Sequence, residues 1–513
     1  MRKFKKYGII YIIKKNMLSG NYMNYIKGKE RDQLIIESIE SYIDEDNEVR
    51  VIDKIVDCID IESLGFTIGK NSVAGRASYN PRYLLKLYIY GYLNGIRSSR
   101  KLAKQCLINK EVIWLVKDTT PKYRVIADFR KDNVVALEHL FNHFVEYYIG
   151  LGLYGKTLIA VDGTKLEASA SKRKHYSKNK ITKMRSIAES KIKEYLHDIE
   201  MADKSEDVDY ETIDRSKVQK SIAKLEENLK HYDEIETQMD IAGDNEINFT
   251  DNDARTVKFG AHQGTDVGYN VQSAVDSKNK LITSFYVGNI STDHGQLFNM
   301  SNKCKEIYNV ETLSALADKG YFQISDLVEC ERNGITTYVS KPNYSTQIGD
   351  SRYFNNKFKY QKEENLYICP EGQKLYCITV KEDTKTKQYR NLEACSNCKN
   401  KNKCNNAKNG KVITRDEFSE ISDTIIKRVE DNKKLYRQRQ CLVEHPFGTL
   451  KRNMNFSYLL LRNFEKVRGE ISLAFFAYNL KRVINIIGVK ELVIALLTPI
   501  ISLFFFEKEL LAA

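Results

Sequence analysis

The stretch that decides the fold is Thr157-Leu-Ile-Ala-Val161, an apolar run followed at once by Asp162 and Gly163. A short apolar run bounded by turn-forming residues predicts a buried β-strand, here one that ends at Asp162. A second run, Leu313 to Ala317, leads in the same way into Asp318. Because a carboxylate at the end of a buried strand is poorly solvated, two such acids call for a compensating cation. Each acid taken alone could equally be a turn residue, since Asp-Gly is a common turn pair.

The surrounding pattern predicts an α/β fold in which these two strands share a sheet. A strand, a strand pair and then helices alternating with strands give the order typical of such a sheet. Further strands are expected at 269–276, 280–288 and 336–341, and helices at 293–308 and 324–333. If the strands before Asp162 and Asp318 are neighbours, both carboxylates emerge at one end of the sheet. Asp293, at the start of the first of these helices, could reach the site together with His294, but it is interpreted as a helix cap.

A third acid, Glu444, lies in a helix-like and strongly basic stretch. Residues 431–468 contain nine Lys or Arg against three acids, a net charge of +6. Arg437, Glu444 and Lys451 are seven residues apart and should share one face of a helix, although Pro446 allows a break after Glu444. Two strand-end aspartates and one helical glutamate supply the oxygen ligands that Mg²⁺ or Mn²⁺ prefers, and basic charge around them suits a phosphodiester substrate.

The N-terminal part is expected to be a compact helical domain. Asn80-Pro81 reads as a cap and first helical residue, Ser98-Ser99 caps a second helix, residues 111–117 form a third, and Thr120-Pro121 starts a fourth. Such a unit over 75–150 could place a helix in a DNA groove, or it could be a purely structural cap.

Composition favours a polyanionic partner. The 513 residues carry 81 Lys and Arg against 68 Asp and Glu, a net charge of +13. Nucleic acid is therefore favoured over a membrane surface, with a merely basic protein as the alternative. No secretory signal is recognised, and the apolar run 492–506 is too short for a typical transmembrane helix, so a terminal core or dimer helix and a cytoplasmic location are expected.

Two stretches interrupt the sheet pattern. Residues 171–240 are highly charged and predict a solvated helical hairpin, and residues 343–430 are polar and contain half of the ten cysteines. A tetrahedral zinc site is predicted for these cysteines, with free thiols or a redox pair as alternatives and Cys377 as a fifth candidate. The four predicted zinc ligands are Cys369, Cys395, Cys398 and Cys404.

Several segments together resemble a family of known proteins. They include Val161-Asp-Gly-Thr-Lys165, Gly268-Tyr-Asn-Val-Gln272, Ala317-Asp-Lys-Gly-Tyr321 and Val443-Glu-His-Pro-Phe-Gly448, in that order along the chain. The sequence resembles the bacterial insertion-sequence DDE transposases, in the branch with an N-terminal helical domain and a cysteine-bearing insertion before the last acid. The likeness covers about residues 23–486.

The resemblance implies a ribonuclease-H-like catalytic core in which Asp162, Asp318 and Glu444 hold two Mg²⁺ or Mn²⁺ ions. It also implies metal-dependent cleavage of DNA at the ends of the element and strand transfer into target DNA. Its DNA partners would be terminal inverted repeats and a target, bound by a homodimer in the synaptic complex, with the protein associated with the nucleoid. The alternatives are a catalytically inactive DNA-binding repressor and a nuclease without joining activity.

The resemblance also assigns DNA contacts and a domain division. Four residues separate Arg439 from Glu444 where the family signature has three, so Arg437 competes with Arg439 for the DNA contact. The expected DNA-binding residues are Tyr436, Arg437, Arg439, Lys451 and Arg452. The expected division is an extension at 1–22, a helical domain at 23–150, a catalytic core at 151–342 plus 431–486 with insertions at 171–240 and 343–430, and an apolar tail at 487–513.

Overall fold

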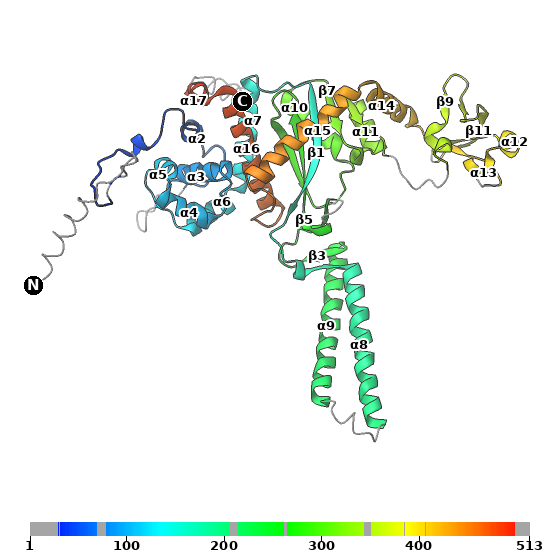
Figure 1. The fold of residues 1–513 in the computed structure, drawn as a ribbon, viewed down its shortest axis with the longest axis horizontal. Helices are drawn as coiled ribbons and strands as arrows, with labels where there is room; N and C mark the ends of the chain where they lie inside the picture. Colours follow the sequence, from blue (N-terminus) through cyan, green and yellow to red (C-terminus); the bar gives the residue numbers. More distant parts are fainter. Residues whose placement is uncertain are drawn as a thin grey trace, which may run out of the picture.

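A six-stranded mixed sheet forms the centre of the molecule (Figure 1). The computed structural model describes residues 29, 31–68, 78–204, 214–260, 264–290, 292–342, 350–383, 385–405 and 407–497. The sheet has the order β4-β5-β1-β7-β8, and β6 also pairs with β5. The strands are β1 (Leu158–Glu167), β4 (Arg255–Gly260), β5 (Gly264–Asp276), β6 (Ile282–Gly288), β7 (Leu313–Ala317) and β8 (Ile335–Val339).

The expectation that the two acid-bearing strands are neighbours is confirmed. Strand β1 runs parallel to β7 with Leu158 beside Ser314 and Ala160 beside Leu316. The same register carried two residues further brings Asp162 level with Asp318. The prediction that β1 ends at Asp162 is wrong, because the strand continues to Glu167. It continues because residues 163–167 pair with 272–268 of the antiparallel strand β5, which satisfies their backbone groups.

Helices cover both faces of this sheet. Alternate residues of β1 point to opposite faces, with Ile159 and Val161 in the main core and Ala160 in a separate cluster. Helices α10 (Gln296–Tyr308), α11 (Ile324–Arg332) and α16 (Phe464–Ile487) contribute to the main core. Helix α15 (Lys433–Gly448) covers the opposite face, where Leu442 and Val443 pack on Ala160 and Leu316. Helix α14 (Ser419–Asp431) packs beside β8, where Arg428 donates to the Thr337 carbonyl at 2.8 Å, and the same arginine forms an ion pair with Glu331 of α11 at 2.6 Å.

The N-terminal part is a bundle of helices, as predicted, although the helix that begins at Ser99 has no capping hydrogen bond from the Ser98 side chain. The Asn80 side chain accepts a hydrogen bond from the Arg82 backbone N–H at 2.9 Å, and Pro81 starts the helix. The fourth helix begins at Tyr123, two residues after Pro121. The helices are α2 (Val49–Cys58), α3 (Pro81–Leu93), α4 (Ser99–Ile108), α5 (Lys110–Leu115), α6 (Tyr123–Asp132) and α7 (Val134–Gly150).

This bundle shares one continuous hydrophobic core with the sheet. Helix α7 packs along α16, and α3 is buried along nearly its whole length. A buried ion pair joins the two parts: Arg97 contacts Glu470 of α16 at 2.8 Å, and their side chains are 1% and 0% exposed. Arg97 also donates to the carbonyls of Asn455 and Tyr458, in the loop before α16. The bundle is thereby fixed to the chain that follows α15.

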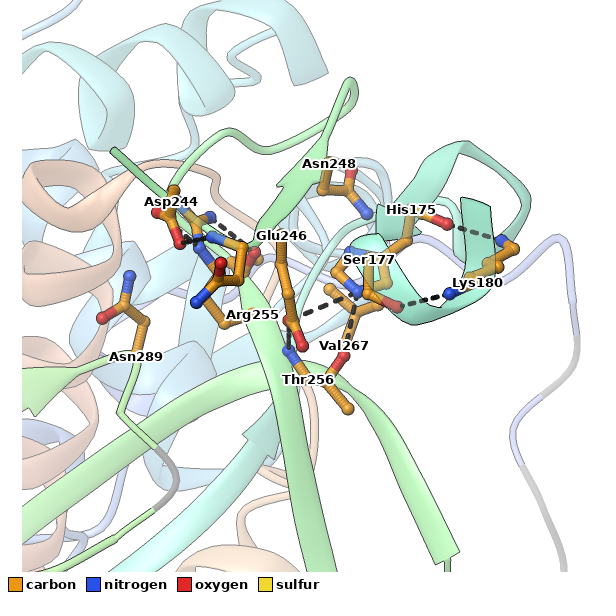
Figure 2. Close-up of polar contacts among 12 residues, drawn as sticks. His175, Ser177, Lys180, Asp244, Glu246, Asn248, Arg255, Thr256, Val267 and Asn289 are labelled. Atoms are coloured by element: carbon orange, nitrogen blue, oxygen red, sulfur yellow. Dashed lines mark hydrogen bonds and ion pairs between the residues drawn. The ribbon is translucent and has the colours of Figure 1, made fainter. Parts of the chain in front are cut away.

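A long helical hairpin projects from the sheet (Figure 1). Its helices, α8 (Lys178–Lys204) and α9 (Arg215–Ala242), lie between β1 and β4 in the sequence. A short ladder of β2 (His175–Ser177) with β3 (Glu246–Asn248) closes its base. Figure 2 shows the polar contacts there: Glu246 accepts from the Thr256 backbone N–H at 2.8 Å, and His175 lies 2.9 Å from the Thr256 hydroxyl. These contacts join the hairpin to strand β4.

The cysteine-bearing insertion folds as a small sheet of its own. Its five strands have the order β13-β12-β11-β10-β9. They are β9 (Lys359–Gln361), β10 (Leu366–Ile368), β11 (Lys374–Lys381), β12 (Thr386–Arg390) and β13 (Ile413–Arg415), with the short helices α12 (Leu392–Ser396) and α13 (Lys401–Cys404). Its core has only five buried hydrophobic residues, namely Phe358, Tyr367, Leu375, Tyr389 and Ile413.

The C-terminal tail begins as a helix. Helix α17 (Val489–Leu497) packs against α2 through a face that includes the buried residues Leu492 and Leu496. The expected extension at 1–22 and the rest of the apolar run, 498–506, lie outside the described residues. No helix in the described ranges is long and apolar enough to cross a lipid bilayer.

Candidate active site

The two aspartates lie on the face of the sheet that α15 covers. Asp162 is two residues from Ala160 and shares its side of β1, beneath that helix. Arg439 of α15 reaches the Asp162 carboxylate, at 3.8 Å between Nη1 and Oδ2. The backbone N–H of Gly163 donates to Asp162 at 2.8 Å, and that of Gly320 donates to Asp318 at 2.7 Å. Each carboxylate is thus held by the turn or strand that follows it.

Burial and neighbouring acids disfavour the ionised form of Asp162, which a bound cation would stabilise. Burial raises the pKa of Asp162 to about 6, against the lowering effect of the Gly163 N–H. The neighbouring acids Asp318 and Asp293 raise this pKa further, and Arg439 lowers it. A single arginine at 3.8 Å therefore compensates the crowded negative charge only in part.

Asp293 is a third member of the acidic group formed with Asp162 and Asp318, and its interpretation as a helix cap is wrong. Helix α10 begins after Gly295, and no side chain caps it. The Asp293 carboxylate instead accepts hydrogen bonds from Gln272 at 2.6 Å, Asn270 at 2.9 Å and Lys165 at 3.1 Å. Gln272 and Asn270 lie opposite Gly163 and Lys165 in the β1–β5 ladder, so this network flanks β1 next to Asp162.

Gly163 leaves the space that this network occupies. A Cβ atom built on Gly163 would lie 2.5 Å from the Gln272 Nε2 and 2.9 Å from the Asp293 Oδ1. Gln272 cannot easily move away, because its Oε1 accepts from the buried Tyr321 hydroxyl while its amide donates to Asp293. The Asp162-Gly163 pair is therefore no turn. Asp162 supplies one carboxylate, and the absence of a side chain at Gly163 leaves room for a second, that of Asp293.

Glu444 lies on α15 but makes a local contact. Its carboxylate accepts from the Gln440 side chain, one turn earlier on the helix, at 2.8 Å, and the residue is exposed. The break considered after Glu444 does not occur, since α15 continues through Pro446 and passes into a π-helical turn, Thr449–Asn453. Within the described residues, no three His, Cys, Asp or Glu side chains form a group that could hold a metal ion.

The basic residues of this region fall into two sets. Lys451 lies near Asp162 and Lys165: poor solvation lowers its pKa, as does the Lys165 ammonium, while Asp162 raises it. Arg439 faces Asp162, whereas Arg437 and Arg452 are exposed and Tyr436 is partly buried. The helix and the π-helical turn thus direct Arg439 and Lys451 toward the acids.

The four cysteines predicted to bind zinc line one cavity. Cys369, Cys395, Cys398 and Cys404 surround a volume of about 40 Å³ in the small sheet domain. Burial raises the pKa of the Cys404 thiol, Lys411 lowers it, and the other three thiols raise it further. Cys377 does not line this cavity.

Two models of known families match parts of the chain. Residues 368–484 match a transposase DDE domain, and residues 37–132 match a transposase domain (DUF772). Both matches support an insertion-sequence DDE transposase. Searches of curated proteins and of solved structures found no match. In this transposase, the DDE-domain match contains Glu444 and the four clustered cysteines, while Asp162 and Asp318 lie outside both matched segments.

For Asp293 the sequence left two roles open, a place in the site and a helix cap, and the cap was the wrong choice. It was preferred because Asp is a favoured N-cap residue and a helix was expected to start at this position. The polar pair Asn270 and Gln272 within an otherwise buried strand was the available clue, since buried amides need partners.

Proposed function

We propose that this transposase uses Asp162, Asp318 and Glu444 to hold two Mg²⁺ or Mn²⁺ ions, cleaves DNA at the ends of its element and joins the freed 3′ end to a target. The observation that carries the proposal is the parallel pairing of β1 with β7 beneath α15, which brings Asp162 close enough to Asp318 for the two carboxylates to interact. Carboxylate oxygens are the ligands that these ions prefer. When bound, such ions would align the attacking oxygen and offset the charge that develops on the phosphate.

The sheet order supports assigning the core to the ribonuclease-H-like fold. Three strands, β1, β7 and β8, are parallel neighbours, and the antiparallel pair β5 and β6 continues the sheet on the other side of β1. The two aspartates then belong to the central strand and to the end of its parallel neighbour. Glu444 enters from a helix packed across both strands.

In this proposal the protein side chains have distinct tasks. Asp162 and Asp318 form the fixed part of the site, because their carboxylates are held by backbone N–H groups. Glu444 would help to hold the cation in place of its hydrogen bond with Gln440. Arg439, which faces Asp162, would be available to contact a phosphate once a bound cation supplied the positive charge.

The remaining basic residues would bind the DNA backbone. Lys451 has its ammonium close to Asp162 and is suited to hold the phosphate next to the cleaved bond. Arg437, Arg452 and Tyr436 lie further along the same surface and suit phosphate contacts outside the reaction centre. A homodimer would hold the two terminal inverted repeats together during the reaction.

The test is cleavage and strand transfer by the purified protein on the DNA that flanks its own reading frame, with Mg²⁺. Substitution of Asp162, Asp318 or Glu444 by Ala should abolish both reactions and leave binding of the element ends intact. Glu167→Ala is the matched control, because this acid lies on the same strand but is half exposed, five residues from Asp162. Full cleavage by two of the three site variants would refute the assignment.

Two further outcomes would replace the proposal by its alternatives. DNA binding without cleavage by the wild-type protein would indicate a repressor of transposition. Cleavage without joined products would indicate a nuclease.

A further inference from the structure

The small sheet domain cannot depend on its hydrophobic core alone. Among its described residues between Asp350 and Arg415, five buried hydrophobic side chains form the core cluster, and Tyr353 and Leu366 are also buried. Several apolar residues of β11 remain exposed, such as Tyr376 and Val380. Domains of this size usually need a disulfide, a metal or another staple in addition to their core. The cavity lined by the four cysteines lies where such a staple would act, between the β10–β11 turn and the two short helices.

The backbone around the cavity is shaped to present sulfur atoms. The Gln373 backbone N–H donates to the Cys369 Sγ at 3.3 Å. The turn that allows this contact requires Gly372, whose φ is +77°. Gly410, at φ +72°, lets the other loop close on Cys395, because a Cβ there would lie 2.7 Å from the Cys395 Cβ. Both turns therefore use glycine to reach the thiols.

The charges at the cavity also fit a cation bound by thiolates. Four thiolates around a divalent cation carry a net charge of about −2. Lys401 and Lys411 both line the same cavity and can offset that charge. The sequence spacing Cys395-x2-Cys398 is typical of one half of a structural zinc site.

We propose that Cys369, Cys395, Cys398 and Cys404 bind one structural Zn²⁺ that holds this domain together. The thiols line a common cavity without forming a closed ligand group in the described structure, so binding must draw them closer and release their protons. Coupling of this kind makes the ion part of the domain's folding free energy. The inference is independent of the proposed DNA chemistry, because it concerns a structural ion outside the catalytic core.

Zinc analysis of the full-length protein tests the proposal without any DNA. The wild-type protein should contain about one zinc ion per chain. Cys395→Ser and Cys398→Ser should each reduce this content to near zero. Cys377→Ser should retain it, since Cys377 belongs to the same domain but does not line the cavity. Equal zinc content in Cys395→Ser and wild type would overturn the proposal.

A second measurement avoids the danger that a variant fails to fold. Wild-type protein stripped of metal and titrated with Co²⁺ should develop sulfur-to-cobalt charge-transfer absorption and the intense visible bands of tetrahedral coordination. Addition of Zn²⁺ should abolish these bands. Absence of both signals, or cysteines recovered as disulfides under native purification, would show that thiols here serve another purpose and would refute the site.

Discussion

Replacing Glu470 by Gln should destabilise the packing of the N-terminal helical bundle against the sheet and α16. The Glu470 carboxylate is fully buried and accepts from Arg97 at 2.8 Å, from the Leu460 N–H at 2.9 Å and from the Leu461 N–H at 2.8 Å. The substitution keeps the shape but leaves the Arg97 guanidinium without its counter-ion in a place that water does not reach. Arg97 would also lose the anchor for its contacts with Asn455 and Tyr458.

The expected cost follows from the burial of the pair. Removing one partner of a buried ion pair typically costs about 3–5 kcal/mol. For a cooperative unit of roughly 150–250 residues this corresponds to a fall in Tm of about 6–20 °C. The double change Arg97→Met with Glu470→Met should cost less than the sum of the single changes, because no unpaired charge remains.

Trp114 makes the measurement simple. It is the only tryptophan of the chain, and it lies in α5 of the bundle, so its fluorescence reports on this part of the molecule. Urea unfolding followed by fluorescence and by circular dichroism should give an earlier transition in Glu470→Gln. Glu138→Gln is the control, because its partner Arg468 is half exposed and the pair should contribute at most about 1 kcal/mol. A Glu470→Gln protein within about 0.5 kcal/mol of wild type would refute the reasoning.

Two further predictions concern the network beside Asp162. Asp293→Asn removes the anion that holds Lys165 and should reduce DNA cleavage by about 10- to 100-fold while the circular dichroism spectrum and Tm stay close to wild type; unchanged cleavage rates would contradict a role for this acid. Gly163→Ala forces a methyl group to within 2.5 Å of the Gln272 amide and 2.9 Å of Asp293, and should cost about 10²-fold in cleavage rate; an Ala variant as active as wild type would show that the network has room to spare.

Strand and helix identity in the core could be read from local patterns. The apolar runs before Asp162 and Asp318 predicted both strands, and Asn80-Pro81 predicted the start of α3. These signals are local, since they depend on burial within one run or on the capping of one turn. Strand β4 was not predicted, because Arg255–Gly260 mixes charged, aromatic and small residues without a clear period.

The end of β1 could not be predicted, because the pairing partner decides it. Asp-Gly reads as a turn when considered alone, yet Gly163–Glu167 form a ladder with β5, whose residues lie about a hundred positions further along the chain. The prediction of a helix cap for Asp293 was wrong for the same reason. Its partners Lys165, Asn270 and Gln272 come from two other strands, and only the register of β1 against β5 brings them together.

The ladder of β2 with β3 has a consequence for how the gene can change. The arm formed by α8 and α9 is about 40 Å long, and its base is joined by its own two strands, so whole helical turns can be gained or lost beyond that point without moving the central sheet. A single codon inserted between Thr157 and Asp162 would instead rotate the aspartate to the other side of its strand. Insertions or deletions of whole helical turns in the arm should therefore leave the central sheet intact, whereas an inserted residue in β1 should displace Asp162 from the site.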